Sequence, residues 1–273
     1  HSTDTSVAMT TARHALDVRL LADDLTGALD SAAAFEGSVP VYLDKAPHRH
    51  PGGVAAVATP TRDMAADRLP DKLAGALDWF VSGGLAFKKV DSLLRGNTFA
   101  ECAHLARAGG FDGVVFAPAY PAQRRVTEDG RQFVVALPGA RPDTKEAVGG
   151  SIVDAFEALG LAAWTSAASH VPAFSEPFDG APRVWVPDVR TEEDLHLVAA
   201  LARRPGNASA DRWMWCGSAG LAHALASVTG RPAPTIAPGD HRTTSTDAHE
   251  SKDARNVLML GASHHAVVRR QWT

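Results

Sequence analysis

Short apolar runs alternate along this chain with longer segments of helical spacing, and this alternation constrains the fold more than any other feature. We expect strands at Val18–Ala22, Val39–Leu43, Val54–Ala58, Leu85–Val90, Gly113–Ala117 and Arg183–Pro187. We expect helices at Gly27–Glu36, Met64–Val81, Thr98–Ala108, Lys145–Leu159, Thr191–Arg203 and Ser218–Ser227. Alternation of this kind predicts an α/β fold, with a mainly parallel sheet flanked by helices.

Changes in composition along the chain predict more than one structural unit within its 273 residues. We expect a disordered or added start at residues 1–17 and one α/β domain at 18–230. A stretch rich in proline and then in polar residues predicts a linker at 231–255. An apolar run into a small-residue turn predicts that a second α/β domain begins at 256–273 and is incomplete here.

Composition excludes several classes of protein. The net charge is −4 with both signs interspersed, which argues against a nucleic-acid or anionic-membrane partner. No apolar run approaches about 18 residues, so we expect no membrane span. Cys102 and Cys216 are too few for a disulfide framework, and no histidine or cysteine group has metal spacing, so we predict no metal site of the protein's own. A reducing, cytoplasmic setting follows.

Two adjacent carboxylates, Asp23 and Asp24, follow the apolar run Val18–Ala22 and precede Thr26 and Gly27. Open parallel sheets bind their ligands at the carboxyl ends of strands. Two carboxylates there can orient hydroxyls, accept a proton or hold a hydrated Mg²⁺. The alternative is a helix cap, which explains one acid well and two poorly. We therefore favour a functional site.

A second apolar run, Leu85–Val90, also ends in polar residues. These are Lys89, Asp91, Ser92, Arg95, Gly96 and Asn97. Lysine and arginine donate hydrogen bonds to carboxylates, arginine as a bidentate fork, while aspartate and serine can bind hydroxyls. Such a mixture suits a small polyhydroxylated acid. The alternative is an ordinary strand end with a surface ion pair and a helix cap.

A loop with two prolines follows the expected strand Gly113–Ala117. Its polar residues Gln123, Arg125 and Thr127 can line a pocket. The alternative, which this segment alone favours, is a stiff connector with solvated arginines.

Small residues, among them Gly217 and Ser218, separate another strand from a helix. Such a turn leaves backbone N–H groups free to meet an anion. Close packing of the helix on the strand would select the same residues, and the two interpretations stay open.

Four of these segments, in order, resemble the signatures of the four-carbon acid sugar kinases, a family also labelled Hrp-dependent type III effectors. The matching segments are Ala22–Ala28, Lys89–Asn97, Pro118–Gln123 and Gly217–Ala222. The resemblance runs from about Val18 to Leu225. Each signature alone is weak, but an unrelated α/β domain would need four ordered coincidences.

The resemblance implies two α/β domains. The first would bind a four-carbon sugar acid such as threonate, erythronate or an oxo-tetronate, and the second would bind ATP with Mg²⁺. Phosphate would go to the terminal hydroxyl of the acid. A homodimer is implied by family analogy.

The resemblance also assigns residue roles. Asp23 and Asp24 would be the catalytic pair, binding hydroxyls, with one of them acting as base. The expected substrate-binding residues are Thr26, Lys89, Asp91, Ser92, Arg95, Gly96, Asn97, Gln123 and Arg125. The expected cofactor-binding residues are Gly217, Ser218 and Ser263.

The chain departs from the family pattern at several positions. Leu93 stands where members usually carry threonine, and Arg124 where they carry glycine. The segment Gly261–Gln271 matches the opening of the nucleotide domain mainly at Ser263, Val267 and Gln271. An alternative function is therefore a non-catalytic sugar-acid-binding or regulatory protein that has lost its nucleotide site.

Overall fold

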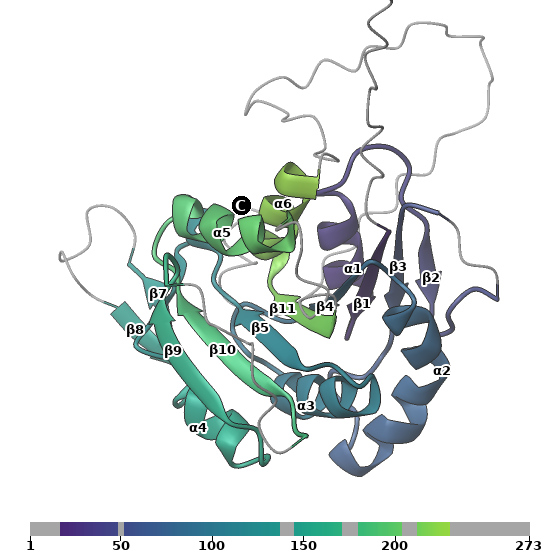
Figure 1. Cartoon of the computed structure of the whole chain (residues 1–273), viewed down its shortest axis with the longest axis horizontal. Coiled ribbons are helices and arrows are strands. Elements are labelled where there is room, and N and C mark those ends of the chain that lie inside the picture. The colour runs from purple at the N-terminus through teal and green to yellow at the C-terminus, as the bar shows by residue number, and fades with distance from the viewer. Residues whose placement is uncertain (1–16, 49–51, 137–144, 171–179, 204–211, 230–273) are drawn as a thin grey trace, which may run out of the picture.

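The computed structural model describes residues 17–48, 52–136, 145–170, 180–203 and 212–229 (Figure 1). Residues 1–16 of the expected start, the expected linker at 231–255 and the expected second domain at 256–273 lie outside the described residues.

The described residues form an eight-stranded sheet in which every pairing is parallel, which confirms the predicted fold class. The strands are β1 (Val18–Ala22), β2 (Val41–Leu43), β3 (Val54–Ala58), β4 (Leu85–Lys89), β5 (Gly113–Ala117), β9 (Ala163–Ala167), β10 (Arg183–Asp188) and β11 (Trp213–Gly217). Their order is β2-β3-β1-β4-β11-β5-β10-β9. The central strands β1, β3, β4, β5 and β11 are buried along their whole length, as expected for a sheet covered on both faces.

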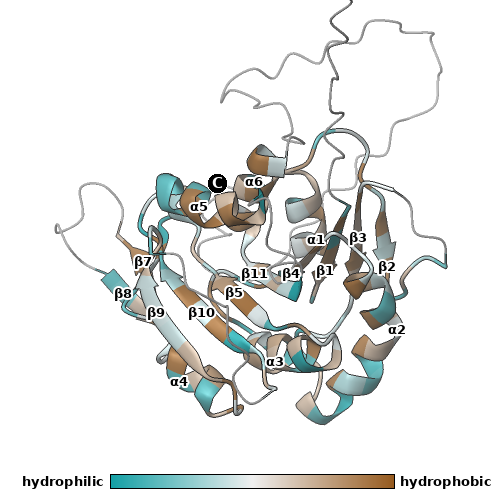
Figure 2. Ribbon diagram, viewed as in Figure 1, coloured by the Kyte–Doolittle hydropathy of each residue, from teal (hydrophilic) through white to brown (hydrophobic). Residues whose placement is uncertain are grey.

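Helices cover both faces of this sheet (Figure 1). They are α1 (Leu25–Ala32), α2 (Leu69–Val81), α3 (Thr98–Ala108), α4 (Ile152–Glu157), α5 (Glu192–Ala200) and α6 (Ala219–Thr229). Helices α1, α5 and α6 pack on one face and α2, α3 and α4 on the other, with a separate apolar core on each side. Brown, apolar segments occur on the strands and on the helices of both layers (Figure 2).

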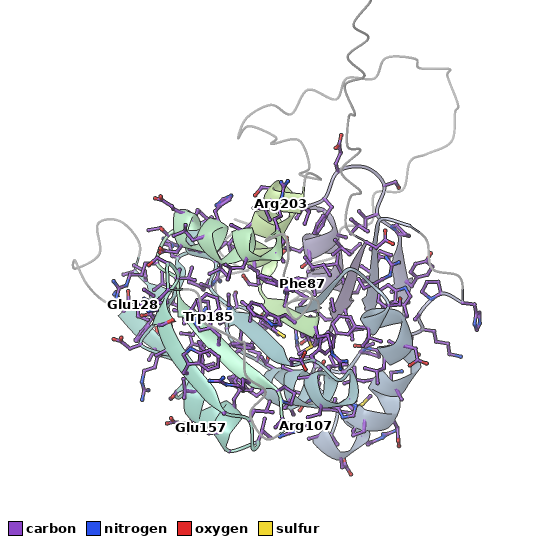
Figure 3. The ribbon with its side chains drawn as sticks, in the orientation of Figure 1. Phe87, Arg107, Glu128, Glu157, Trp185 and Arg203 are labelled. Atoms are coloured by element: carbon purple, nitrogen blue, oxygen red, sulfur yellow. The ribbon has the colours of Figure 1, made fainter. Side chains whose placement is uncertain are left out.

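The side chains follow the same division. Phe87 and Trp185 are fully buried in the core beneath α5 and α6, whereas Arg107, Glu157 and Arg203 lie at the surface (Figure 3). Helix α5 begins with a threonine cap: the Thr191 hydroxyl accepts from the Asp194 N–H, and the Asp194 carboxylate accepts from the Thr191 N–H.

A small antiparallel sheet was not expected from the sequence. It consists of β6 (Arg125–Glu128), β7 (Arg131–Val135) and β8 (Lys145–Val148), and β9 was also missed. The expected helix Lys145–Leu159 is therefore wrong in its first part. Gly149, at φ 68°, ends β8, and the hydroxyl of Ser151 then caps the shorter helix α4. Pairing with β7 decides the conformation of Lys145–Val148, which no local periodicity reveals.

The strand order creates one place where ligands are expected. From β1 the chain leaves through α1 toward β2, and from the adjacent β4 it leaves through α3, on the other face, toward β5. Adjacent strands whose connections diverge leave a crevice at their carboxyl ends, the usual binding position in open α/β sheets. The polar residues after β1 and β4 both lie at these carboxyl ends, where the crevice is expected.

Candidate functional site

One arginine holds both predicted catalytic aspartates. The Arg62 guanidinium donates from Nε and Nη2 to the two Asp23 carboxylate oxygens at 2.8 and 2.9 Å, and from Nη1 to Asp24 Oδ2 at 2.7 Å. Asp24 also caps α1, because its Oδ1 accepts from the Gly27 N–H at 2.8 Å. The cap alternative is thus correct for Asp24, and it coexists with the pairing to Arg62.

Sequence reasoning missed Arg62, although a signal was present. Arg62 lies four residues after β3, at the same edge of the sheet as the aspartates. The rule that singled out the ends of β1 and β4 would have found it if applied to the end of the expected strand Val54–Ala58.

The residues after β4 hold the Arg62 loop in place. The Asn97 side-chain amide donates to the carbonyls of Thr61 and Met64 at 2.9 and 2.7 Å. Gly96 has φ 74°, and a Cβ there would lie 2.7 Å from the Arg62 carbonyl oxygen, so glycine is required both for the backbone conformation and for the close approach. The predicted segments that follow β1 and β4 are therefore joined through Arg62 and its loop.

Lys89 is a buried lysine beside the aspartate pair. Its Nζ donates to the Val90 carbonyl at 2.9 Å and would lie 3.1 Å from a Cβ added at Gly27 of α1. Burial lowers the pKa of Lys89, and the nearby charges of Asp23 and Asp91 offset this only in part. In its ammonium form Lys89 can donate hydrogen bonds to an anionic ligand.

Asp91 and Arg95 form a bidentate pair, with Arg95 Nε and Nη2 donating at 2.7 and 2.8 Å. Burial alone would raise the pKa of Asp91, but the hydrogen bonds and charge of Arg95 outweigh it and hold that pKa below its usual value. The Arg95 side chain remains 41% exposed. Its outer edge is accessible to a further carboxylate.

The β6–β7 hairpin is tied to the same edge of the sheet. The buried Gln132 side chain donates to the Ser92 carbonyl at 2.9 Å and accepts from the Thr127 hydroxyl at 2.7 Å. Arg125 donates to the Gln123 side chain, and its Nε is buried without a hydrogen-bond partner in the described part of the chain. Burial lowers the pKa of Arg125, although Asp91 opposes this.

The turn with Gly217 and Ser218 lies next to Lys89 across the sheet, since Gly217 pairs in register with it. A Cβ at Gly217 would lie 2.6 Å from the Ala117 carbonyl oxygen and from the Leu221 side chain. The buried Ser218 hydroxyl donates to the Ala119 carbonyl and accepts from the Gly220 N–H. These contacts fit the close-packing interpretation, and a role toward ATP stays a prediction for both residues.

The structure thus brings most predicted residues to one edge of the sheet. Thr26 is exposed in the first turn of α1, and Ser263 lies outside the described residues. Gln132 and Lys88 join Arg62 as residues at this edge that were not selected from the sequence; Lys88 was visible as the first of two lysines in β4.

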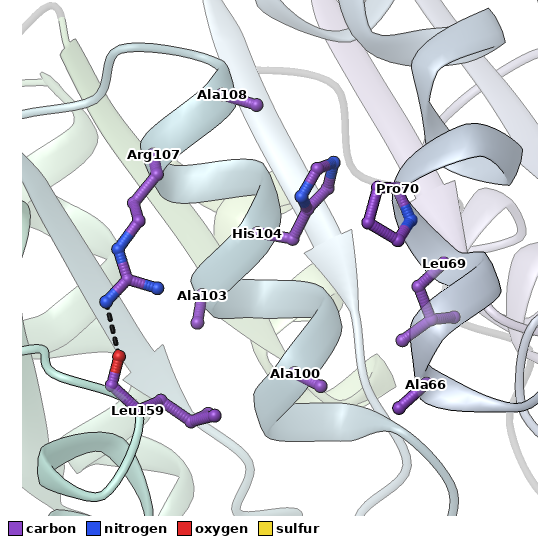
Figure 4. Close-up of a pocket in the computed structure, with 9 residues that line it drawn as sticks. All are labelled: Ala66, Leu69, Pro70, Ala100, Ala103, His104, Arg107, Ala108 and Leu159. Carbon is purple, nitrogen blue, oxygen red and sulfur yellow. Dashed lines mark hydrogen bonds between the residues drawn. The ribbon is translucent and has the colours of Figure 1, made fainter.

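A separate groove lies between α2 and α3, on the face away from α1 (Figure 4). Its volume is about 500 Å³, and none of the predicted site residues lines it. Its lining is mostly alanine and other apolar side chains, with His104 and Arg107 from α3. The chemistry of the crevice is therefore absent from this groove.

The described ranges contain no group of three or more histidine, cysteine, aspartate or glutamate residues arranged to hold a metal ion. They also contain no helix of the length and apolarity needed to cross a bilayer.

The sequence is similar to sugar-handling proteins. A family model described as a sugar-binding N-terminal domain matches residues 18–225. A D-threonate kinase of Cupriavidus necator is 34% identical over 245 residues, covering 80% of this chain and 57% of the relative. A D-threonate kinase of Bordetella bronchiseptica is 31% identical over 232 residues, covering 77% and 55%. The chain spans little more than half the length of these relatives.

Solved structures share the fold. A Bordetella bronchiseptica protein with a domain of unknown function, a domain-swapped dimer with bound citrate, has a TM-score of 0.57 at 25% identity, covering 77% of this chain and 56% of its own. A Haemophilus influenzae protein has a TM-score of 0.58 at 19% identity, covering 78% and 56%, which supports the fold alone.

Proposed function

This chain belongs to the family of sugar-binding N-terminal domains, in agreement with its resemblance to the four-carbon acid sugar kinases, and we propose that it forms the substrate half of such a kinase. The reaction is transfer of phosphate from ATP to the terminal hydroxyl of a four-carbon sugar acid. The relatives are named D-threonate kinases, so D-threonate is the first candidate substrate. Erythronate and oxo-tetronate are the others.

The observation that carries this proposal is the joining of acidic and basic side chains at one crevice. Arg62 fixes Asp23 and Asp24 on one side, and Asp91 fixes Arg95 on the other. In the described structure each oxygen of Asp23 and Asp24 accepts one hydrogen bond, and a carboxylate oxygen can accept two. The aspartates can therefore take substrate hydroxyls, while Arg95, Arg125 and Lys89 take the carboxylate.

The geometry suits phosphoryl transfer, in which positioning and charge neutralisation matter most. The Asp24 side chain is 24% exposed, against 4% for Asp23. We assign to Asp24 the hydrogen bond from the attacking hydroxyl and to Asp23 the anchoring of a neighbouring hydroxyl. Lys89 lies beside both, and the charges of the two aspartates oppose the lowering of its pKa by burial.

ATP, when bound, supplies the phosphoryl group, and Mg²⁺ would arrive with it. Gly217, Ser218 and Ser263 are the residues proposed to face the nucleotide. The polar contacts of Ser218 are made within the fold, so any hydrogen bonds of this turn to ATP must come from backbone N–H groups.

Assembly and setting are also proposals. Two solved structures of the Bordetella bronchiseptica protein with a domain of unknown function are domain-swapped dimers, and this supports a homodimer here. Cys102 and Cys216 are both free and buried, which agrees with a reducing, cytoplasmic setting. Analytical ultracentrifugation of the whole chain tests the dimer.

Calorimetric titration with a panel of ligands tests the function. D-Threonate, L-threonate and D-erythronate carry both hydroxyls and carboxylate, butanoate lacks the hydroxyls and erythritol lacks the carboxylate. We expect at least one sugar acid to bind, and both controls to bind at least tenfold more weakly, since each contact group contributes about 1–3 kcal/mol. Equal affinity for butanoate, or no binding of any acid, rejects the proposal.

A further inference from the structure

Lys88 of β4 and Glu101 of α3 form a buried ion pair that has no role in the function proposed above. Lys88 Nζ lies 2.7 Å from Glu101 Oε2, and both side chains are 1% exposed. Successive residues of β4 point to opposite faces of the sheet: Lys88 meets Glu101 of α3, while Lys89 approaches Gly27 of α1. The two adjacent lysines therefore contact different helices on opposite faces of the sheet.

Stability does not explain this pair. Removing two charges from water costs several kcal/mol per ion, and apolar replacements of a buried pair are often neutral or stabilising. Within the described part of the chain, Glu101 Oε1 has no hydrogen-bond partner, which adds to the cost. The role of the pair is therefore better inferred from its location in the fold than from its contribution to the free energy of folding.

Lys88 and Asp23 lie toward the same face of the sheet. Lys88 pairs in register with Leu21 of β1, and side chains alternate along a strand, so Asp23, two residues after Leu21 and one after the end of β1, continues the side that carries Lys88. Arg62 approaches Asp23 from the β3 loop, and Lys89 adds a charge from the other face of β4. The other titratable neighbours of Lys88 are Glu101 and Cys102 on α3, with Cys216 on β11 close to Cys102.

The charges agree with this arrangement. Burial alone would raise the pKa of Asp23, but Lys88 and Arg62 outweigh it and hold that pKa below its usual value. Burial would lower the pKa of Lys88, but Glu101 and Asp23 keep it raised. Glu101 thus keeps the lysine charged, and the charged lysine keeps Asp23 ionised.

We propose that Lys88 and Glu101 are a positioning pair that holds Asp23 as a carboxylate, so that it accepts a hydrogen bond from the sugar acid and never donates one. The pair touches no substrate and acts only through Asp23. The part of the inference that concerns the sugar acid rests on the proposed function; the part that concerns the charge of Asp23 does not.

Carboxyl ¹³C NMR of Asp23 in the full chain tests the inference directly, with the resonance assigned by Asp23→Asn. The double variant Lys88→Met/Glu101→Leu removes both charges and keeps approximate volume. We expect the Asp23 pKa to rise by about one unit or more. Glu101→Gln keeps Lys88 but removes the carboxylate that favours its charged form, so we expect the Asp23 pKa to rise here too, by less than in the double variant. If the apolar pair does not fold, Lys88→Gln/Glu101→Gln carries the same expectation.

An unchanged Asp23 pKa in a folded charge-free variant overturns the inference and leaves the pair a structural element. Calorimetry with D-threonate across pH supplies the link to substrate. Binding should weaken as pH falls through the Asp23 pKa, so the charge-free variant should lose affinity at a higher pH than wild type. A shifted Asp23 pKa with an unshifted binding profile overturns the assigned role toward the sugar acid. Absence of D-threonate binding to wild type rejects that substrate alone, and the NMR result still decides the pair.

Discussion

Two regions at the same edge of the sheet use opposite means to bring strands and loops together. At the ends of β1, β3 and β4, charged side chains join three loops: Arg62 binds both aspartates, and Asn97 binds the Arg62 loop. At the ends of β5 and β11, glycine and serine allow helix α6 to approach the backbone around Ala117 and Ala119. The first region is built from charge and the second from the absence of side chains.

The difference explains why sequence alone treated the regions unequally. Adjacent carboxylates at a strand end are costly to keep together, so they indicate a site. Small residues at a strand end are expected equally from close packing and from phosphate binding, and only the contacts of Gly217 and Ser218 separate the two. Substitutions in the charged region are therefore expected mainly to weaken binding of the sugar acid, and those in the small-residue region to lower the stability of the fold.

The largest effect is expected from Arg62→Ala. It leaves Asp23 and Asp24 adjacent and without their shared partner, and charge-assisted hydrogen bonds contribute about 1.5–3 kcal/mol each. We expect the free energy of unfolding to fall by about 2–4 kcal/mol in urea titrations and D-threonate binding to disappear. Arg131→Ala, an exposed arginine in β7, is the matched control. Retained affinity in Arg62→Ala would show that the aspartates do not need this partner.

Asp24→Asn and Arg95→Ala should come next, with affinity for the sugar acid reduced at least 100-fold, or about 2.7 kcal/mol. Asparagine still caps α1, so Asp24→Asn removes charge without removing the cap. Calorimetry on variants with wild-type thermal unfolding measures this. Asp78→Asn, exposed on α2, controls for net charge. Wild-type affinity in both site variants would separate the charged region from substrate binding.

Gly217→Ala should act on stability. The added Cβ would lie 2.6 Å from the Ala117 carbonyl oxygen, so backbone must move, and overpacking of this kind costs about 1–3 kcal/mol. Chemical denaturation measures it, with Gly75→Ala on α2, where an added Cβ meets no neighbouring atom within 4 Å, as the comparison. Equal stability of the two variants would contradict the packing role of Gly217.

The smallest effect is expected from Arg124→Gly. Arg124 has φ 59°, a left-handed conformation that costs an L-residue roughly 1 kcal/mol and glycine little. It is also the position at which the resembling family usually carries glycine. We expect a gain of about 0.5–1 kcal/mol in thermal or urea unfolding. A clear loss would mean that the Arg124 side chain makes a stabilising interaction of its own.

The sequence alone predicts the features that depend on residues close together in the chain. The strands of the central sheet other than β9, and the residues after β1 and β4, could be predicted, because an apolar run and the polar residues that follow it adjoin in the chain. Arg62 and Gln132 could not be assigned partners, since those partners lie on other loops. The β6–β7 hairpin was missed although its two-residue turn, Asp129-Gly130 with φ 48° and 67°, is a local hairpin signal. Strand β8 was missed because it pairs with β7 across an intervening segment of the chain.

A crystal structure of the chain grown with D-threonate tests the central claim most directly. The account predicts density for the acid between the ends of β1 and β4, with hydroxyls on Asp23 and Asp24 and the carboxylate on Arg95, Arg125 or Lys89. The acid found only in the groove between α2 and α3, or at another surface while the crevice contains solvent, would contradict the account.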